Sequence, residues 1–408
     1  MRNISQSFAV RAGCVVFFSA GCLLAQDWPQ WRGANRDGKV SGFTAPQTWP
    51  TNLTRKWQAD VGKGDTTPVL LGEKLYTFGR IDADEVMRCL DSATGKALWE
   101  SKYPANYVVT GPPSAHPGPR SSPVVANGKI CMLGVGGILS CLDAATGAVL
   151  WRKQSTNDYL GVPFQFDSSM SPIIVDGRCL VHVGGKGSGA VLAFHLNSGA
   201  SDWKWDGDAP ANSSPVVMMA GGKKQLVTLT AKRLIGLDLA NGKLLWQAPF
   251  EAAQGNNTTP IVDGTTVIFT GQAKGLIAMK IEPQGEDFTL SLLWTNAQLG
   301  ARFTTPVLKD GLLYGYNGSF FCASAATGAT LWTDAAKRGQ SAAMLDAGPV
   351  ILALTSNGEL AAFQPGGADY AQLARIKVAG TETWAHPVVA GNKFFIRDRE
   401  TVSLWTLQ

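Results

Sequence analysis

The sequence predicts an all-β protein, an eight-bladed β-propeller of four-stranded antiparallel blades in which the N-terminal strand completes the last blade. Three recurring features support this prediction. A Ser/Thr-Ser/Thr-Pro motif, or a variant of it, opens each unit between residues 66 and 387, at intervals of about 46 residues. Glycine-bearing turns divide each unit, and most units end in a Trp. This length and pattern are typical of a propeller blade.

The unit at residues 121–151 shows the pattern in full. Ser121-Ser122-Pro123 opens a first strand, and Asn127-Gly128, Val135-Gly136-Gly137 and Ala144–Gly147 turn the chain three times before Trp151. Glycine supplies the positive φ that such turns need. The closing Trp recurs as Trp99, Trp151, Trp203, Trp246, Trp294 and Trp332. Its regular place predicts packing between neighbouring blades rather than stacking on a cofactor.

Ring closure is predicted from the two ends of the repeat region. The eighth unit ends at Leu404–Leu407, one strand short, whereas Arg55–Ala59 contains a Trp but follows no complete unit. We expect the segment at 55–59 to supply the missing strand, because closure removes the exposed edge of an open array.

The first 25 residues predict an export signal. Arg2 and Arg11 precede or flank a short apolar run that ends at Ala25, which is the pattern of a cleaved signal peptide. The run is shorter than the roughly 20 residues of a membrane-spanning helix, so we expect no transmembrane span and a place in the periplasm or cell envelope. Acylation of Cys22, as in a lipoprotein, is the alternative.

Two further regions follow the predicted signal. Residues 26–54 contain Trp28, Trp31 and Trp49 outside any repeat, and large apolar side chains seldom stay exposed. We therefore expect an irregular segment that packs on the propeller, which itself covers residues 55–408.

Several functional classes find no support in the sequence. The 36 basic and 31 acidic residues show no clustered basic face, so we expect no nucleic-acid partner. No catalytic motif such as GxSxG or HExxH is present, and the four histidines lack metal-ligand spacing. We expect no metal site. The spacing of Cys131 and Cys141 places them opposite each other across a hairpin, which leaves a cross-strand disulfide open.

The residues just before each opening motif should form a ring around one mouth of the central channel. Loops of one kind share a face of the propeller, and binding sites favour such loops. In blade order the ring is Asp65, Arg120, Asp167, Asn212, Asn257, Arg302, Gln340 and Trp384.

Two members of this ring predict an anion site. Arg120 and Arg302 belong to blades two and six, so they should face each other and could clamp a carboxylate. Phe166, Phe303 and Trp384 could supply stacking surface beside them. The site would bind a small anionic ligand or a protein partner.

The alternative interpretation is that Arg120 has a structural role. It would form an ion pair with Asp65 or Asp167 and tie neighbouring loops together. In either case we expect a monomer.

Residues 141–151, Cys-Leu-Asp-Ala-Ala-Thr-Gly-Ala-Val-Leu-Trp, and their copies resemble the pyrroloquinoline-quinone (PQQ) repeat. The resemblance covers about residues 55–408. The segment Asp27–Gly33 with Asn35–Gly38 is similar to the entry sequence of exported bacterial PQQ-repeat-like propellers.

This resemblance implies two branches of one superfamily. One holds quinoprotein dehydrogenases, which oxidise alcohols or sugars with PQQ and calcium. The other is similar to the noncatalytic lipoprotein of the outer-membrane barrel-assembly machinery, which binds a partner protein. The eight units fill the chain and leave no room for long loop insertions, and an adjacent Cys-Cys pair is absent. We therefore expect a noncatalytic scaffold without a cofactor, and keep a PQQ- and calcium-dependent dehydrogenase as the alternative.

Overall fold

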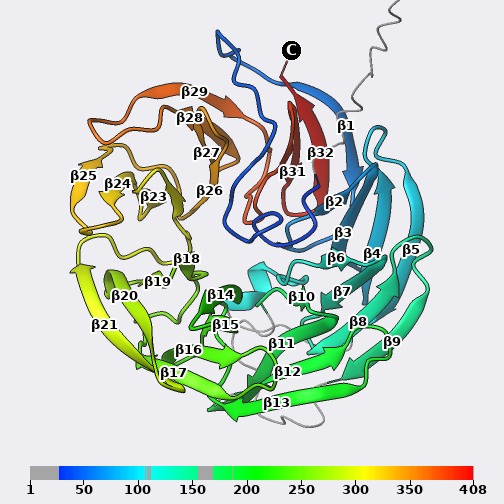
Figure 1. Ribbon diagram of the computed structural model, residues 1–408. Coiled ribbons are helices and arrows are strands. Elements are labelled where there is room, and N and C mark those ends of the chain that lie inside the picture. The colour runs from blue at the N-terminus through cyan, green and yellow to red at the C-terminus, as the bar shows by residue number, and fades with distance from the viewer. Residues whose placement is uncertain (1–26, 106, 108–111, 155–168, 186, 408) are drawn as a thin grey trace, which may run out of the picture.

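The computed structural model describes residues 27–407 except 106, 108–111, 155–168 and 186. Eight four-stranded antiparallel sheets stand around a central axis as the blades of a propeller (Figure 1). The predicted fold class is confirmed. The predicted export signal, Cys22, Phe166 and Asp167 lie outside the described residues.

Blades one to four follow one another along the chain, each running from an inner first strand to an outer fourth strand. Blade one comprises β2 (Val69–Leu71), β3 (Lys74–Ile81), β4 (Asp84–Asp91) and β5 (Ala97–Pro104). Blade two comprises β6 (Val124–Ala126), β7 (Lys129–Leu133), β8 (Ile138–Asp143) and β9 (Val149–Gln154). Blade three comprises β10 (Ile173–Val175), β11 (Arg178–Gly185), β12 (Ser188–His195) and β13 (Ser201–Gly207). Blade four comprises β14 (Val216–Ala220), β15 (Lys223–Leu229), β16 (Arg233–Asp238) and β17 (Leu244–Pro249).

The remaining blades keep the same order until the last. Blade five comprises β18 (Ile261–Asp263), β19 (Thr266–Gly271), β20 (Gly275–Gln284) and β21 (Asp287–Asn296). Blade six comprises β22 (Val307–Lys309), β23 (Leu312–Tyr316), β24 (Phe320–Ser324) and β25 (Thr330–Thr333). Blade seven comprises β26 (Ala342–Asp346), β27 (Ile351–Thr355), β28 (Glu359–Phe363) and β29 (Gln372–Lys377). Blade eight comprises β30 (Val388–Ala390), β31 (Lys393–Arg397), β32 (Thr401–Thr406) and β1 (Thr54–Asp60).

Blade eight closes the ring as predicted. Strand β1 pairs antiparallel with β32, from Thr54 opposite Thr406 to Asp60 opposite Thr401. The first and last strands therefore satisfy each other's backbone groups. None of the helical segments in the described part of the chain has the length and apolar content needed to cross a membrane.

The recurrent Trp packs most blades against the next one. Trp99 of blade one lies over Gly147, in the turn before the outer strand of blade two; a Cβ built on that glycine would lie 2.5 Å from the indole. Trp151 repeats the contact with blade three, where its Nε1 donates to Leu196 O at 2.9 Å. The predicted packing of Trp between blades is confirmed.

This packing predicts a large difference between two glycine substitutions. Gly147 and Gly128 both have positive φ, 76° and 69°, but only Gly147 faces an indole, whereas the space beside Gly128 is open. We expect Gly128→Ala to cost about 1 kcal/mol of unfolding free energy and Gly147→Ala about 2 kcal/mol more, because the second adds a steric clash. Urea denaturation of both variants checks this. Equal losses of unfolding free energy would show that Trp99 can move aside without an energetic penalty.

The opening motifs join neighbouring blades through their hydroxyls. Thr67 N donates to Ser122 Oγ at 2.9 Å, and Ser122 N donates to Ser171 Oγ at 3.0 Å. His386 N of blade eight donates to Thr67 Oγ1 at 2.9 Å, which carries the same pattern across the closure. Ser and Thr recur in the motif because a short hydroxyl accepts from the backbone N–H of the preceding blade.

An N-terminal segment, residues 27–40, fills the centre of the ring, and we call it the plug. Figure 1 shows it in dark blue, folded back into the ring beside β2 and β31. Trp28 bridges to Leu70, and Val40 N donates to Asp346 O at 2.8 Å. Asp346 ends its first strand and Leu70 is the middle residue of its own, both beyond the opening motif, so the plug enters the channel from the face opposite the opening motifs.

Two buried arginines fix the plug. Arg36 donates to the carbonyls of Ser171, Pro172 and Pro215 in blades three and four; the Pro215 bond is 2.8 Å. Arg32 donates to Thr305 O at 3.1 Å and to Pro306 O at 3.0 Å in blade six. Burial lowers the pKa of Arg36 to about 9 and that of Arg32 to about 10. The plug thus connects blades that do not touch one another directly.

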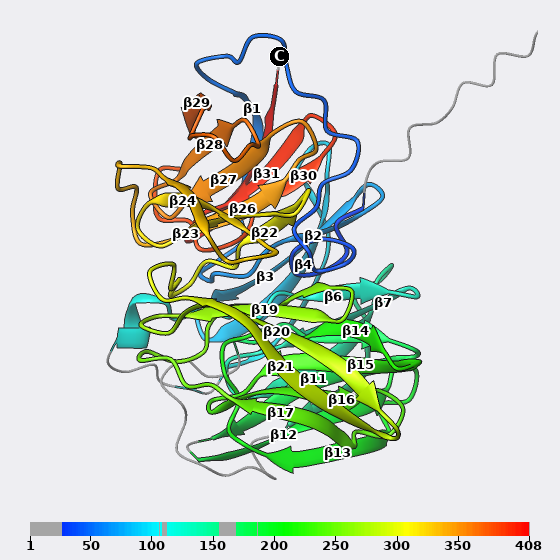
Figure 2. The ribbon, with the colours of Figure 1, turned by 60° about the vertical axis from the view of Figure 1, so that its left-hand side comes forward.

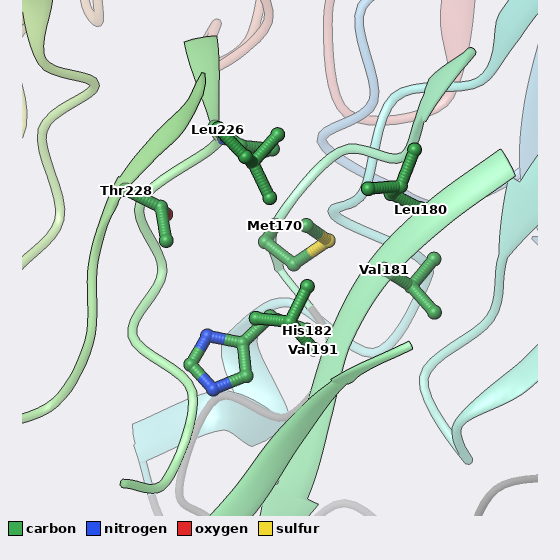
Figure 3. Close-up of a pocket in the computed structure, with 8 residues that line it drawn as sticks. Met170, Leu180, Val181, His182, Val191, Leu226 and Thr228 are labelled. Atoms are coloured by element: carbon green, nitrogen blue, oxygen red, sulfur yellow. The ribbon is translucent and has the colours of Figure 1, made fainter. Parts of the chain in front are cut away.

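Between blades three and four, His182 lies in a tight apolar gap (Figure 3). Met170, Leu226 and Thr228 are among the side chains that close on it and leave no space for a water molecule. Its Nε2 lies 3.0 Å from Asp208 O. Burial lowers the pKa of His182 to about 4.

His182 predicts a loss of stability in acid. The unfolded chain binds a proton at His182 near pH 6.5, whereas the folded chain binds it only near pH 4. The contribution of His182 to the free energy of unfolding is therefore complete above pH 6.5. It falls by about 3 kcal/mol as the pH drops from about 6.5 to about 4. The difference in unfolding free energy between wild type and His182→Leu should shrink or reverse by that amount between pH 7.5 and pH 4. A pH-independent difference would contradict this assignment.

The cysteines keep the register that the sequence predicts. Cys131 of β7 stands opposite Cys141 of β8, and Cys179 of blade three lies in the same apolar cluster. All three are buried free thiols in this structure.

Candidate functional site at the channel mouth

The face opposite the plug carries the loops that lead into each first strand. We call it the mouth. Its described members from the predicted ring are Asp65, Arg120, Asn212, Asn257, Arg302, Gln340 and Trp384. Figure 2 shows the 3-10 helix η1 (Pro112–Ala115), which belongs to the long connection between blades one and two, standing out at the left edge of the ring.

A continuous run of aromatic and cationic side chains crosses part of the mouth. Trp384 of blade eight meets the Phe303 ring edge-to-face at 5.3 Å and the His116 ring edge-to-face at 5.6 Å. The Arg302 guanidinium lies 4.5 Å from the centroid of Phe303. The structure therefore brings together Arg302, Phe303 and Trp384 from the predicted set and adds His116.

His116 is fixed by two polar contacts. Its Nδ1 lies 2.8 Å from Asp65 Oδ2, and its backbone carbonyl accepts a 2.7 Å hydrogen bond from Arg120 Nη2. Asp65 and Arg120 thus both position His116. Sequence reasoning missed this role because His116 lies in a long connection without a repeat counterpart; its nearness in sequence to Arg120 was the available signal.

The connection that carries His116 is anchored by a polar cluster. Tyr107 Oη lies 3.0 Å from Pro117 O and 3.2 Å from Glu85 Oε1, so these two acceptors share its one hydroxyl proton, and the Arg80 guanidinium lies 4.5 Å from the Tyr107 ring. Arg80 also donates to Pro117 O at 3.3 Å. These contacts hold the end of the connection against blade one.

Glu85, the centre of this cluster, is 1% exposed. It accepts hydrogen bonds from Tyr103 and, at 2.9 Å, from Val135 N, in addition to Tyr107. Desolvation raises the pKa of Glu85, and the three donors oppose that shift. The carboxyl group therefore links blade one, blade two and the connection between them.

The other side of the mouth is held by amides. Asn212 Nδ2 donates to Asn257 Oδ1 at 2.9 Å, and Asn257 Nδ2 donates to Arg302 O at 3.2 Å. Gln340 is exposed, and its backbone N donates to Ser356 Oγ at 3.0 Å. Asn212 and Asn257 thus support the loop of Arg302, while the Gln340 side chain faces solvent.

The described residues of the mouth do not fit a calcium-bound quinone. Calcium takes six to eight oxygen ligands, usually with several carboxylates. The Asp65 carboxylate lies against His116, the Glu382 carboxylate accepts from Arg399 at 2.9 Å, and Asn257 Oδ1 already accepts from Asn212. No cluster of three or more His, Cys, Asp or Glu that could hold a metal occurs among the described residues.

Comparison with known proteins gives a family and two groups of relatives. The family model described as outer membrane protein assembly factor BamB matches residues 82–334. The outer membrane protein assembly factor BamB of Burkholderia pseudomallei is 24% identical over 50% of this chain and 48% of its own length. The dehydrogenase subunit of the quinone alcohol dehydrogenase of Komagataeibacter europaeus is 27% identical over 38% of this chain and 21% of its own length. The matches thus span about half or less of these two curated relatives.

Among solved structures, the fold is similar to the quinohemoprotein alcohol dehydrogenase of Comamonas testosteroni. The TM-score is 0.68 at 13% identity, with 93% of this chain and 80% of that chain covered. At this identity the likeness concerns the fold alone.

Proposed function

Because the chain belongs to the family of the outer membrane protein assembly factor BamB, whose model matches more than half of it, we propose that it is an exported scaffold of the cell envelope that binds a protein partner at its mouth. In this proposal residues 1–25 act as the export signal, and the propeller performs no chemistry of its own.

The run of side chains across the mouth carries the proposal. Trp384, Phe303 and Arg302 belong to the residue types that dominate binding energy in protein interfaces. Asp65, Arg120 and Asn257 hold the loops of this run in place, so a partner would meet a largely ordered surface. Arg302 would pair with a carboxylate of the partner, since no described carboxylate forms an ion pair with it.

Site-specific photo-crosslinking in the producing cell tests the proposal. A crosslinker at exposed Gln340 should capture a component of outer membrane protein assembly, and one at exposed Leu98 on the outer strand of blade one should not. Trp384→Ala combined with Arg302→Ala should reduce the Gln340 product at least tenfold in a protein of unchanged abundance. If the double variant gives as much crosslinked product as wild type, or if wild type gives none, the mouth is not the binding surface.

A quinone-dependent dehydrogenase is the second candidate. It is favoured by the similarity to a quinone alcohol dehydrogenase subunit and by the fold shared with a quinohemoprotein. Titration of the purified protein with PQQ and calcium, followed by dye reduction with alcohols or sugars, distinguishes the two. Saturable binding and substrate-dependent reduction would replace the scaffold proposal.

A further inference from the structure

His386 lies where the plug meets the ring. Its imidazole packs edge-on against the indole of Trp31, with 4.5 Å between centroids, and the residue is 6% exposed. Trp31 Nε1 donates to Thr259 Oγ1 at 3.1 Å, which places the indole across the channel between blades five and eight. His386 Nδ1 has no hydrogen-bond partner among the described residues.

The charges around His386 disfavour a proton on it. Arg32 of the plug is 1% exposed and is the charged group that acts on the imidazole, whereas Trp31 and Thr67, which contact His386, are neutral. Burial and then Arg32 lower the pKa of His386 well below its ordinary value. A protonated imidazole would put a second buried cation near Arg32; the Asp37 carboxylate acts on Arg32, whereas only burial and Arg32 act on His386.

We propose that opening of the plug takes up one proton at His386, so that acid releases residues 27–40 from the channel. When the plug leaves, Trp31 and Arg32 move away, and the imidazole becomes solvated. It then titrates near its ordinary value of about 6.5. The open state binds the proton more tightly than the closed state, so the opening equilibrium rises about tenfold per pH unit below that value.

Carboxylates also lie on the plug or face it. They are Asp27, whose Oδ1 accepts from Gly72 N, Asp37, whose Oδ1 accepts from Lys39 N, and Asp346, which lies 3.5 Å from Lys309 Nζ. Substitution of His386 separates its response from any response of these carboxylates.

Amide hydrogen exchange of the full-length protein measures the opening. The reporters are Trp28 N, Gly38 N and Val40 N, which donate to Leu70 O, Arg32 O and Asp346 O at 2.8, 2.9 and 2.8 Å. After correction for the intrinsic exchange rate, the opening constant should rise about 30-fold from pH 7.5 to pH 5. An opening constant that stays the same over this range would overturn the proposal.

Two leucine substitutions provide the matched comparison. His386→Leu cannot take up the proton and should make the opening constant independent of pH, whereas His182→Leu, at the other buried histidine, should keep the 30-fold rise. If His386→Leu does not fold, His386→Gln serves in its place. A 30-fold rise that persists in the His386 variant would assign the proton to another group. These readouts involve no partner and are independent of the proposed binding function.

Discussion

Arg36→Ala is expected to lower the free energy of unfolding by about 4 kcal/mol, since hydrogen bonds to charged groups contribute more than neutral ones and buried acceptors left unpaired are costly. Arg36 is 3% exposed and donates to carbonyls of Ser171, Pro172 and Pro215. Its loss leaves these acceptors without a partner and opens a cavity where blades three and four meet the plug. Chemical denaturation followed by tryptophan fluorescence measures the change.

The controls for Arg36 separate charge from geometry. Arg36→Lys keeps the charge but not the planar fork that reaches two blades at once, so it should recover less than half of the loss. Arg399→Ala removes an arginine whose side chain is 46% exposed and paired with Glu382, and should cost less than about 1 kcal/mol. Equal effects of Arg36→Ala and Arg399→Ala would mean that the plug adds nothing to the stability of the ring.

Glu85→Ala is expected to cost about 3 kcal/mol and to loosen the connection that carries His116. The carboxyl group accepts from Tyr103, Tyr107 and Val135 N, and its removal leaves buried donors without an acceptor. Urea denaturation gives the free energy, and limited proteolysis of the segment around Pro112–Ala115 gives the local effect, with faster cleavage expected.

Two neighbouring changes test the Glu85 assignment. Glu85→Gln keeps an acceptor oxygen at nearly the same volume and should cost less than half as much. Asp84→Ala, one residue earlier, removes a carboxylate that pairs with exposed Lys102 and should cost less than about 1 kcal/mol. Cleavage that stays at the wild-type rate in Glu85→Ala would show that the connection is held by other contacts.

The fold could be predicted because its signals repeat. The opening motif, the Gly-bearing turns and the Trp each recur at one spacing, and each has one local physical role that the structure confirms, such as Trp99 over Gly147. The strand at Thr54–Asp60 could be assigned to blade eight because counting strands leaves that position vacant. Repetition turns weak single-residue signals into a strong one.

The site was predictable only in part, for a physical reason. Loops at the mouth follow no repeat, so the contacts of Trp384 with His116 and Phe303 depend on chain paths that periodicity does not determine. The clamp between Arg120 and Arg302 stays a prediction. The hydrogen bonds of Arg36 to carbonyls 135 or more residues away could not be predicted from the sequence either. Every residue has a backbone carbonyl, so no particular side chain marks the acceptors of this guanidinium.

The pairing of β1 with β32 sets the order in which the molecule can be completed. Thr54 pairs with Thr406, so the first strand to be synthesised cannot form its sheet until the last strand has been made. Contacts this distant slow folding and leave both strand edges exposed in the meantime. A chain that crosses a membrane from its N-terminus would therefore arrive with an unmatched edge, and holdase chaperones on the far side would have reason to shield that edge until translocation ends.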